Sequence, residues 1–187
     1  MTGTHLPVTG GPDRPVAVLV GFMGAGKSTV GRVLADRLGV DYVDTDREIV
    51  RRTGQSIPEI FSGGGPAEFR QIERDIVLDV LNSQRGIVAL GGGAVTTQAV
   101  RDALPGHRVV HLKVTAEEGF SRVCGTDRPL LAGADPAQRY RELLTERADA
   151  YTGVATIEVD AGAGDAEDVA DEIIAAIARE LAPERTP

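Results

Sequence analysis

Residues 21–28 (GFMGAGKS) constrain this chain more than any other part of its sequence. They follow the pattern Gly-x4-Gly-Lys-Ser, with the apolar run 16–20 before them and a helical pattern over 27–38 after them. An apolar strand before the pattern and a helix after it are the context in which it forms a phosphate-binding loop. A glycine-rich turn that matches by chance is the alternative. Strand, pattern and helix together favour a loop that binds a nucleoside triphosphate.

The residue types within this loop predict its contacts. Glycines let backbone N–H groups turn toward the phosphates, and the N-terminus of the following helix adds partial positive charge. Lys27 would reach the β- and γ-phosphates as a point charge, and the Ser28 hydroxyl would ligate Mg²⁺. We therefore expect the donor nucleotide to contact Gly24, Ala25, Gly26, Lys27, Ser28 and Thr29.

The rest of the chain alternates between strand and helix patterns. Apolar runs rich in β-branched residues recur at 16–20, 40–43, 87–90, 109–114 and 155–159. Most are continuous rather than alternating, as in strands buried on both faces of a parallel sheet. Helical patterns lie between them at 27–38, 66–82, 137–151 and 166–181. This order predicts an α/β fold with right-handed crossovers, whose ligands bind at the carboxyl ends of the strands.

Length and charge narrow the function classes. A chain of 187 residues suits one domain, predicted at 15–181, with a disordered leader at 1–14 and a frayed tail at 182–187. The net charge of −8 argues against nucleic acid or an anionic membrane as a partner. The single cysteine, Cys124, excludes an intrachain disulfide and a zinc cluster. With no signal peptide and no long apolar span, we expect a cytoplasmic protein.

Two carboxylates follow the second predicted strand, in Asp44-Thr45-Asp46. In an extended segment, residues at i and i+2 point the same way, here toward the carboxyl edge of the sheet. Asp44 could then join the Mg²⁺ shell through water, and Asp46 could accept a hydrogen bond from a hydroxyl of the acceptor. The alternative is a helix N-cap before REIVRR. The position after strand two favours the functional interpretation.

Two arginines stand beside apolar helical stripes. Arg70 has Glu73 three residues on, within reach of its guanidinium, although an exposed ion pair is the usual outcome at this spacing. Arg147 falls on the apolar side of its helix, seven residues after Tyr140. A guanidinium directed inward needs a partner, and a substrate carboxylate is one candidate. A snorkelling arginine or a buried ion pair is equally consistent with the pattern.

Glycines and a polar loop complete the candidate site. Gly91-Gly92-Gly93 follows the third strand, where bare backbone N–H groups could meet an anion or a hydroxyl. The run 63–65 (GGG) follows no strand, and we interpret it as a flexible connector. The loop around Arg128 (TDRPLLAG), within a segment at 124–136, is typical of a lid that closes over phosphates.

Taken together, GFMGAGKSTVGR, DTD, EFRQIE, GGGAV, RPLL and ERADAY resemble the shikimate kinase family in order and spacing, over roughly residues 16–159. The resemblance implies a three-layer P-loop NTPase fold with a five-stranded parallel sheet flanked by helices, a small lid and substrate-binding helices at about 45–82. It also implies transfer of the γ-phosphoryl of ATP to the 3-hydroxyl of shikimate, in chorismate and aromatic amino acid biosynthesis, by a Mg²⁺-dependent monomer.

By motif, the resemblance implies roles for individual residues. Asp46 would contact the shikimate hydroxyls, and Arg70 and Arg147 would clamp the carboxylate. Lys27, Asp46 and Arg128 would be the catalytic residues, and Ser28 and Asp44 the metal site. Further contacts are implied for the acceptor at Gly92, Gly93, Phe61 and Phe69, and for ATP at Arg122 and Arg128. The rivals are a gluconate kinase, a nucleoside-monophosphate kinase and a non-catalytic nucleotide-binding regulator.

Overall fold

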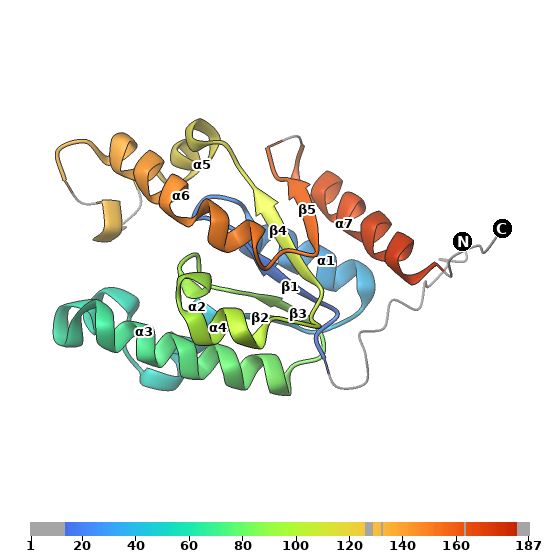
Figure 1. The fold of residues 1–187 in the computed structure, drawn as a ribbon, viewed down its shortest axis with the longest axis horizontal. Helices are drawn as coiled ribbons and strands as arrows, with labels where there is room; N and C mark the ends of the chain where they lie inside the picture. The colour runs from blue at the N-terminus through green and yellow to red at the C-terminus, as the bar shows by residue number, and fades with distance from the viewer. Residues whose placement is uncertain (1–13, 126–128, 132, 163, 183–187) are drawn as a thin grey trace.

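The structure is a computed structural model, and it describes residues 14–125, 129–131, 133–162 and 164–182. Within these ranges, five strands form one parallel sheet in the order β2-β3-β1-β4-β5. Figure 1 shows them side by side with β1 at the centre. The strands are β1 (Ala17–Val20), β2 (Tyr42–Asp44), β3 (Ile87–Ala89), β4 (Val109–Lys113) and β5 (Ile157–Asp160). The predicted parallel sheet is confirmed, and each strand begins and ends within two residues of its predicted bounds.

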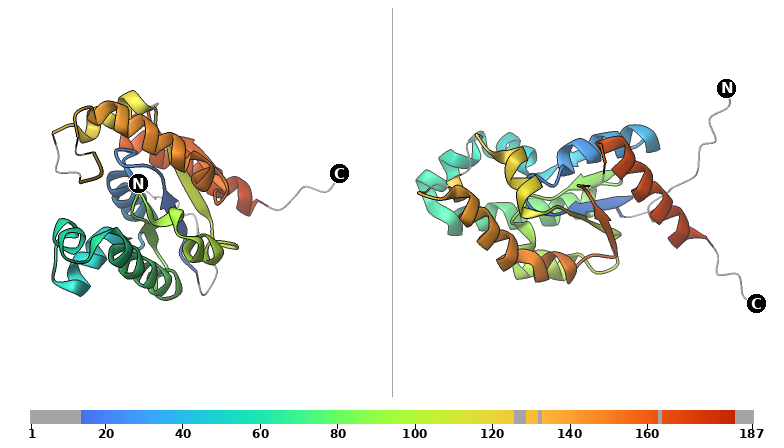
Figure 2. Two further views of the ribbon diagram at one scale, coloured as in Figure 1. Left: turned by 60° about the vertical axis from the view of Figure 1, so that its left-hand side comes forward. Right: turned by 90° about the horizontal axis from the view of Figure 1, so that it is seen from above.

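Helices cover both faces of the sheet, which gives three layers (Figure 2). On one face α1 packs against α7, and the other α-helices lie on the opposite side or beyond the carboxyl edge. The helices are α1 (Lys27–Leu38), α2 (Thr45–Thr53), α3 (Ile57–Ser83), α4 (Gln98–Ala103), α5 (Ala116–Val123), α6 (Pro136–Thr152) and α7 (Ala166–Leu181). Two short 3₁₀ turns, at Ala94–Thr96 and Pro129–Leu131, lie in the connections.

Strand β1 separates two hydrophobic cores. Val18 and Val20 pack into the core beneath α3, α4 and α6, whereas Ala17 and Leu19 face α1 and α7. All four residues are buried, because successive side chains of a strand point to opposite faces and both faces are covered. This explains why the sequence of the strand is continuously apolar.

The helix after β2 and the glycine connector differ from their predictions. The chain is extended only as far as Asp44, and Thr45 begins α2, so Asp44 and Asp46 are not residues of one extended segment. Helix α3 begins at Ile57 with a Ser56 capping box rather than at residue 66. The run 63–65 is helical up to a break at Gly65, whose φ of 75° only glycine adopts readily. The predicted connector is therefore a kink between two helical pieces.

Some predicted segments lie outside the described residues. These are the leader apart from Arg14, the tail apart from Ala182, and residues 126–128 and 132 of the predicted lid. Among the helices that the structure describes, none combines the length and apolar character that crossing a membrane requires.

Candidate functional site

The phosphate loop joins β1 to α1 at the carboxyl edge of the sheet. Gly24 and Gly26 both have a φ near +84°, and a Cβ on Gly24 would come 2.4 Å from the carbonyl oxygen of Gly119. Only glycine combines this conformation with so close an approach of two backbones. The Lys27 ammonium donates to the carbonyls of Gly21 at 2.7 Å and Phe22 at 3.2 Å. The lysine is thus held over the backbone of its own loop.

Asp44 connects the loop to the end of β2. Its Oδ2 accepts hydrogen bonds from the Ser28 hydroxyl at 2.7 Å and from the Tyr42 hydroxyl at 3.2 Å. Its Oδ1 accepts from the backbone N–H of Asp46 at 3.0 Å, which makes Asp44 the N-cap of α2. The two alternatives for Asp44 are therefore compatible, since one carboxylate caps the helix and also meets Ser28.

The oxygens of Ser28 and Asp44 suit a hard divalent cation. Mg²⁺ is usually held by one or two protein oxygens together with substrate phosphates and water, rather than by a cage of side chains. Within the described residues, no group of three or more His, Cys, Asp and Glu side chains is arranged to hold a metal ion. A pair consisting of one hydroxyl and one carboxylate beside the phosphate loop fits the ion in the nucleotide-bound form.

A hollow of about 610 Å³ opens beside the loop and contains the predicted acceptor residues. Asp46, Arg70 and Arg147 come from three different helices, and the structure brings all three to this one cavity. Phe61 and Phe69 stack at 4.6 Å between ring centroids and form its apolar wall. The complete lining is Met23, Asp46, Ile57, Phe61, Phe69, Arg70, Glu73, Gly92, Gly93, Leu130 and Arg147.

Glu73 holds the guanidinium of Arg70, as the spacing predicted, but the pair is not a surface one. The Glu73 side chain is 2% exposed, and it is bonded to Nη1 of Arg70. Burial raises the pKa of the Glu73 carboxyl, and the charge of Arg70 opposes that rise. A Cβ on Gly93 would come 2.3 Å from the Arg70 guanidinium. The absence of a side chain at Gly93 leaves space for the Arg70 guanidinium.

Arg147 is buried, at 8% exposure, on the inward face of α6. Its guanidinium lies 5.4 Å from the centroid of the Phe22 ring and donates to the Gly92 carbonyl at 3.3 Å. The predicted inward direction is confirmed. The same carbonyl accepts a hydrogen bond from Tyr151, a residue that the sequence did not single out. Tyr151 ends the motif ERADAY, but nothing in the sequence indicated this contact, because its partner is a backbone atom far along the chain.

A second hollow, of about 970 Å³, lies over the phosphate loop and is lined by Lys27, Ser28, Thr29 and Asp44 among others. It shares Met23, Asp46 and Gly92 with the acceptor hollow. The two cavities therefore meet at these three residues. A phosphate in one and an acceptor in the other would be neighbours across the Asp46 carboxylate.

A third hollow, of about 520 Å³, continues from the loop toward α7. Arg122 reaches it and donates to the carbonyls of Gly24 at 3.2 Å and Ala161 at 3.0 Å. The residues after β5 that line it were not identified from the sequence, because they match no motif. These residues are Ala161, Gly164, Asp165, Ala166 and Val169.

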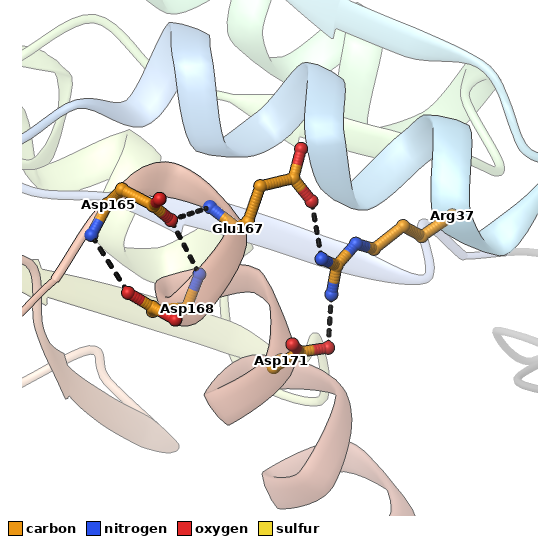
Figure 3. Close-up of polar contacts among 5 residues, drawn as sticks. All are labelled: Arg37, Asp165, Glu167, Asp168 and Asp171. Atoms are coloured by element: carbon orange, nitrogen blue, oxygen red, sulfur yellow. Dashed lines mark hydrogen bonds and ion pairs between the residues drawn. The ribbon is translucent and has the colours of Figure 1, made fainter.

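The start of α7, which forms one wall of the third hollow, is held by hydrogen bonds and ion pairs in its first turns. Asp165 caps the helix by accepting from the N–H groups of Glu167 at 2.8 Å and Asp168 at 3.0 Å. Figure 3 shows Arg37 of α1 lying between Glu167 and Asp171 and paired with both. The helix that carries the phosphate loop and the helix that borders the third hollow are thus linked directly. The remaining predicted ligand, Arg128, lies outside the described residues.

A phosphate loop with its lysine, joined to a cavity with two arginines and a carboxylate, defines a P-loop kinase for a small anionic acceptor. The comparisons with known proteins give the family. The protein-family model described as shikimate kinase matches residues 23–178, and this chain belongs to the shikimate kinase family.

Individual relatives agree with this assignment. The chain is 54% identical to a shikimate kinase of Mycobacterium avium over 147 residues, which is 78% of this chain and 84% of the relative. A Mycobacterium leprae shikimate kinase is 48% identical over 169 residues, or 90% of this chain and 85% of that protein. Among solved structures, the shikimate kinase of Acinetobacter baumannii in complex with shikimate matches with a TM-score of 0.86. It is 37% identical, and the match covers 91% of this chain and 96% of that one. A gluconokinase of Sinorhizobium meliloti, 22% identical with a TM-score of 0.60, shares the fold alone.

Proposed function

We propose that this chain transfers the γ-phosphoryl group of ATP to the 3-hydroxyl of shikimate, giving shikimate 3-phosphate and ADP. This is a step of chorismate and aromatic amino acid biosynthesis. The observation that carries the proposal is the junction of the two hollows. Asp46 lines both of them, so that one carboxylate borders the place for a phosphate and the place for an acceptor.

On the acceptor side, the charges suit a hydroxylated carboxylate. Arg70 and Arg147 provide planar guanidinium groups, which bind a carboxylate in a bidentate manner. Asp46 accepts hydrogen bonds from hydroxyls at the other end of the cavity, and Phe61 and Phe69 pack against the ring. Gly92 and Gly93 add backbone contacts. A sugar acid such as gluconate lacks the flat, partly apolar ring that such a wall would favour.

On the donor side, we assign the phosphates to the loop at Gly24–Lys27 and the first turn of α1. Ser28 would ligate Mg²⁺ directly, and Asp44 would hold it through water. When bound, the ion neutralises charge on the β- and γ-phosphates. Arg122 would border the nucleoside, and Arg128 would close over the phosphates from the lid. The backbone of Ala161 and of residues 164–166 would surround the base.

Phosphoryl transfer asks little covalent chemistry of the protein, so positioning and charge neutralisation dominate. Lys27 and Arg128 stabilise negative charge on the transferring group. Asp46 orients the attacking hydroxyl and accepts its proton as the new P–O bond forms and the bond between the γ-phosphorus and the β,γ-bridging oxygen breaks, so that ADP leaves. Closure of the lid excludes water, which would otherwise compete with the hydroxyl as nucleophile.

We further propose that the enzyme acts as a monomer in the cytoplasm. Val50 and Leu181 are the large hydrophobic side chains that are exposed within the described ranges, so no broad apolar patch is available there for association. The net charge of −8 also opposes self-association. Light scattering after size exclusion should give the mass of one chain, 19.7 kDa. A dimer mass at micromolar concentration would contradict the proposal.

The activity is tested by measuring ADP release with Mg-ATP against shikimate, gluconate and a set of nucleoside monophosphates. We expect stimulation by shikimate alone. Stimulation by another acceptor would replace the proposed substrate. No stimulation by any of them, with ATP still bound, would point to a nucleotide-binding regulator.

A further inference from the structure

The Gly92 carbonyl, in the loop after β3, is held by two side chains of α6. It accepts hydrogen bonds from the Tyr151 hydroxyl and from Nη1 of Arg147, the latter at 3.3 Å. Tyr151 is 1% exposed, so its hydroxyl has the Gly92 carbonyl as a partner in place of water. A buried hydroxyl without such a partner would be costly. The contact therefore fixes the direction in which the carbonyl points.

The direction of this carbonyl sets the direction of the next N–H group. No cis peptide bond occurs among the described residues, and in a trans peptide the C=O and the following N–H point in opposite directions. With the Gly92 carbonyl directed toward α6, the Gly93 N–H is directed away from α6. Gly93 itself lies against the Arg70 guanidinium, at the wall of the acceptor hollow.

The neighbouring N–H groups of this loop are already in use. The Gly91 N–H donates to the Thr45 hydroxyl at 2.9 Å, and the Ala94 N–H donates to the Gly91 carbonyl at 3.0 Å. In the part of the chain that the structure describes, the Gly93 N–H has no protein acceptor, although Gly93 is buried. Since Gly93 also lines the acceptor hollow, this N–H is available to an atom of a bound ligand. Its position beside Arg70 and Arg147 points to an anionic oxygen.

The Tyr151 ring is itself held from behind. His111 of β4 stacks on it, with the ring centroids 5.2 Å apart and the planes at 22°. Glu158 of β5 lies 3.3 Å from Nδ1 of His111. These contacts orient the tyrosine from two strands of the sheet. The Gly92 carbonyl is therefore held, through Tyr151, by residues of the central sheet rather than by its own loop alone.

We propose that Tyr151 is a positioning residue for the acceptor carboxylate. By holding the Gly92 carbonyl, Tyr151 presents the Gly93 N–H to a carboxylate oxygen between Arg70 and Arg147. Tyr151 does not itself touch the substrate. This inference rests on the proposed function, because it assigns a carboxylate ligand to the same cavity.

The test compares wild type with Tyr151→Phe, which keeps the ring on His111 and removes the hydroxyl. Calorimetry on the full chain with ADP bound measures the Kd of shikimate and of its methyl ester, whose carboxylate is masked. We expect the Kd of shikimate to rise about five- to tenfold in the variant, as when the net contribution of one ordinary hydrogen bond is lost. The Kd of the ester and that of ADP should stay within twofold of wild type.

Each other outcome decides against the inference or against its premise. Equal loss for shikimate and its ester, or a parallel loss of ADP affinity, would show a general structural role for Tyr151. An unchanged Kd for shikimate would show that the Gly93 N–H does not depend on the tyrosine. If wild type binds no shikimate, the proposed function fails instead. A spectrum of ¹⁵N-glycine-labelled protein adds an independent readout, since the Gly93 amide should shift with shikimate far more in wild type than in Tyr151→Phe.

Discussion

The Ser28 hydroxyl donates a hydrogen bond of 2.7 Å to the Asp44 carboxylate, and this bond joins the first turn of α1 to the end of β2. The other oxygen of the same carboxylate caps α2, the helix that carries Asp46. The Asp44 side chain thus links the phosphate loop to α2, the helix that carries Asp46. The proposed metal site and the proposed acceptor site therefore share a common support.

Substitutions at Asp44 should separate its two roles. Asp44→Asn keeps a good N-cap but removes the charge, whereas Asp44→Ala removes both. We expect only the alanine variant to lose stability, by about 0.5–2 kcal/mol. Both variants should require at least about tenfold more Mg²⁺ for half-maximal ADP binding, as when a partner of a metal site is lost. Thermal melting without nucleotide and a Mg²⁺ titration of ADP affinity check the two effects. Equal Mg²⁺ dependence in all three proteins would contradict the metal assignment.

The pair of Arg70 and Glu73 predicts a stability that depends on pH. Arg70→Ala leaves the buried Glu73 carboxyl unpaired, a change that costs about 3–5 kcal/mol when both partners are buried. Arg70 is 26% exposed, so we expect a smaller cost of about 2 kcal/mol at pH 8. Burial raises the pKa of Glu73 in the folded protein, and without Arg70 nothing nearby opposes it as strongly. In Arg70→Ala, the folded protein is favoured most when the Glu73 carboxyl is protonated. This stabilisation is complete below the pKa of Glu73 in the unfolded chain, and it is lost as pH rises through the pKa of Glu73 in the folded protein.

Arg70→Ala should therefore be less destabilised at pH 5 than at pH 8 when unfolding in denaturant is followed. The double variant Arg70→Ala/Glu73→Gln has no buried carboxyl at position 73 and should lose this pH dependence. A cost for Arg70→Ala that is the same at both pH values would show that Glu73 is not the group responsible.

Gly93 gives a prediction about the acceptor site with an internal control. In Gly93→Ala, the new Cβ would come 2.3 Å from the Arg70 guanidinium, so the flexible arginine must move. We expect the KM for shikimate to rise about tenfold, with the KM for ATP within twofold of wild type. Gly63→Ala is the matched control, because its Cβ would meet nothing within 4 Å in α3 and alanine favours a helix. A normal KM for shikimate in Gly93→Ala would remove Arg70 from the proposed carboxylate site.

The sequence predicted the elements whose signal is local and missed those that depend on tertiary contacts. The phosphate loop and α7 lie where expected, because glycine pattern and helical periodicity specify them directly. The start of α3 was missed, because three consecutive glycines look like a connector and their helical conformation depends on the Ser56 capping box and on packing of Ile60. The geometry of Asp44 and Asp46 was wrong for a similar reason, since the capping signal at Asp44 outweighed extension of the strand.

In the candidate site, too, residues with a local sequence signal were predicted and residues that depend on tertiary contacts were missed. Arg70, Arg147 and Asp46 were predicted from residue type and motif, and they do meet in one cavity. The contact of Tyr151 was not, because its partner is a backbone carbonyl, and the wall at Ala161 and Gly164–Ala166 was not, because its residues match no motif. Met23 was also missed, since an apolar side chain inside a phosphate loop carries no pattern of its own.

The two histidines within the described ranges predict loss of stability in acid. Burial lowers the pKa of His111 and of His107, and for His111 Glu158 only partly opposes it. Both imidazoles therefore take up protons at a lower pH in the folded protein than in the unfolded chain, where protonation occurs as pH falls through about 6.5. Stability should therefore fall between pH 7.5 and 5.5, by at most about 1.4 kcal/mol per pH unit for each histidine. His111→Gln should reduce the slope when denaturant unfolding is measured across this range. An unchanged slope would assign the effect to other groups.

In the proposed reaction, Asp46 stands between a bound phosphate and a shikimate hydroxyl. This placement is tested most directly by ³¹P NMR of the reaction of Mg-ATP with shikimate, in wild type and in Asp46→Asn. For wild type we predict a phosphomonoester signal coupled to the proton at C3 of shikimate, together with ADP. Asp46→Asn should form it more than tenfold more slowly while its affinity for ATP is unchanged. A phosphate on another hydroxyl, or a near-normal rate in Asp46→Asn, would contradict the account.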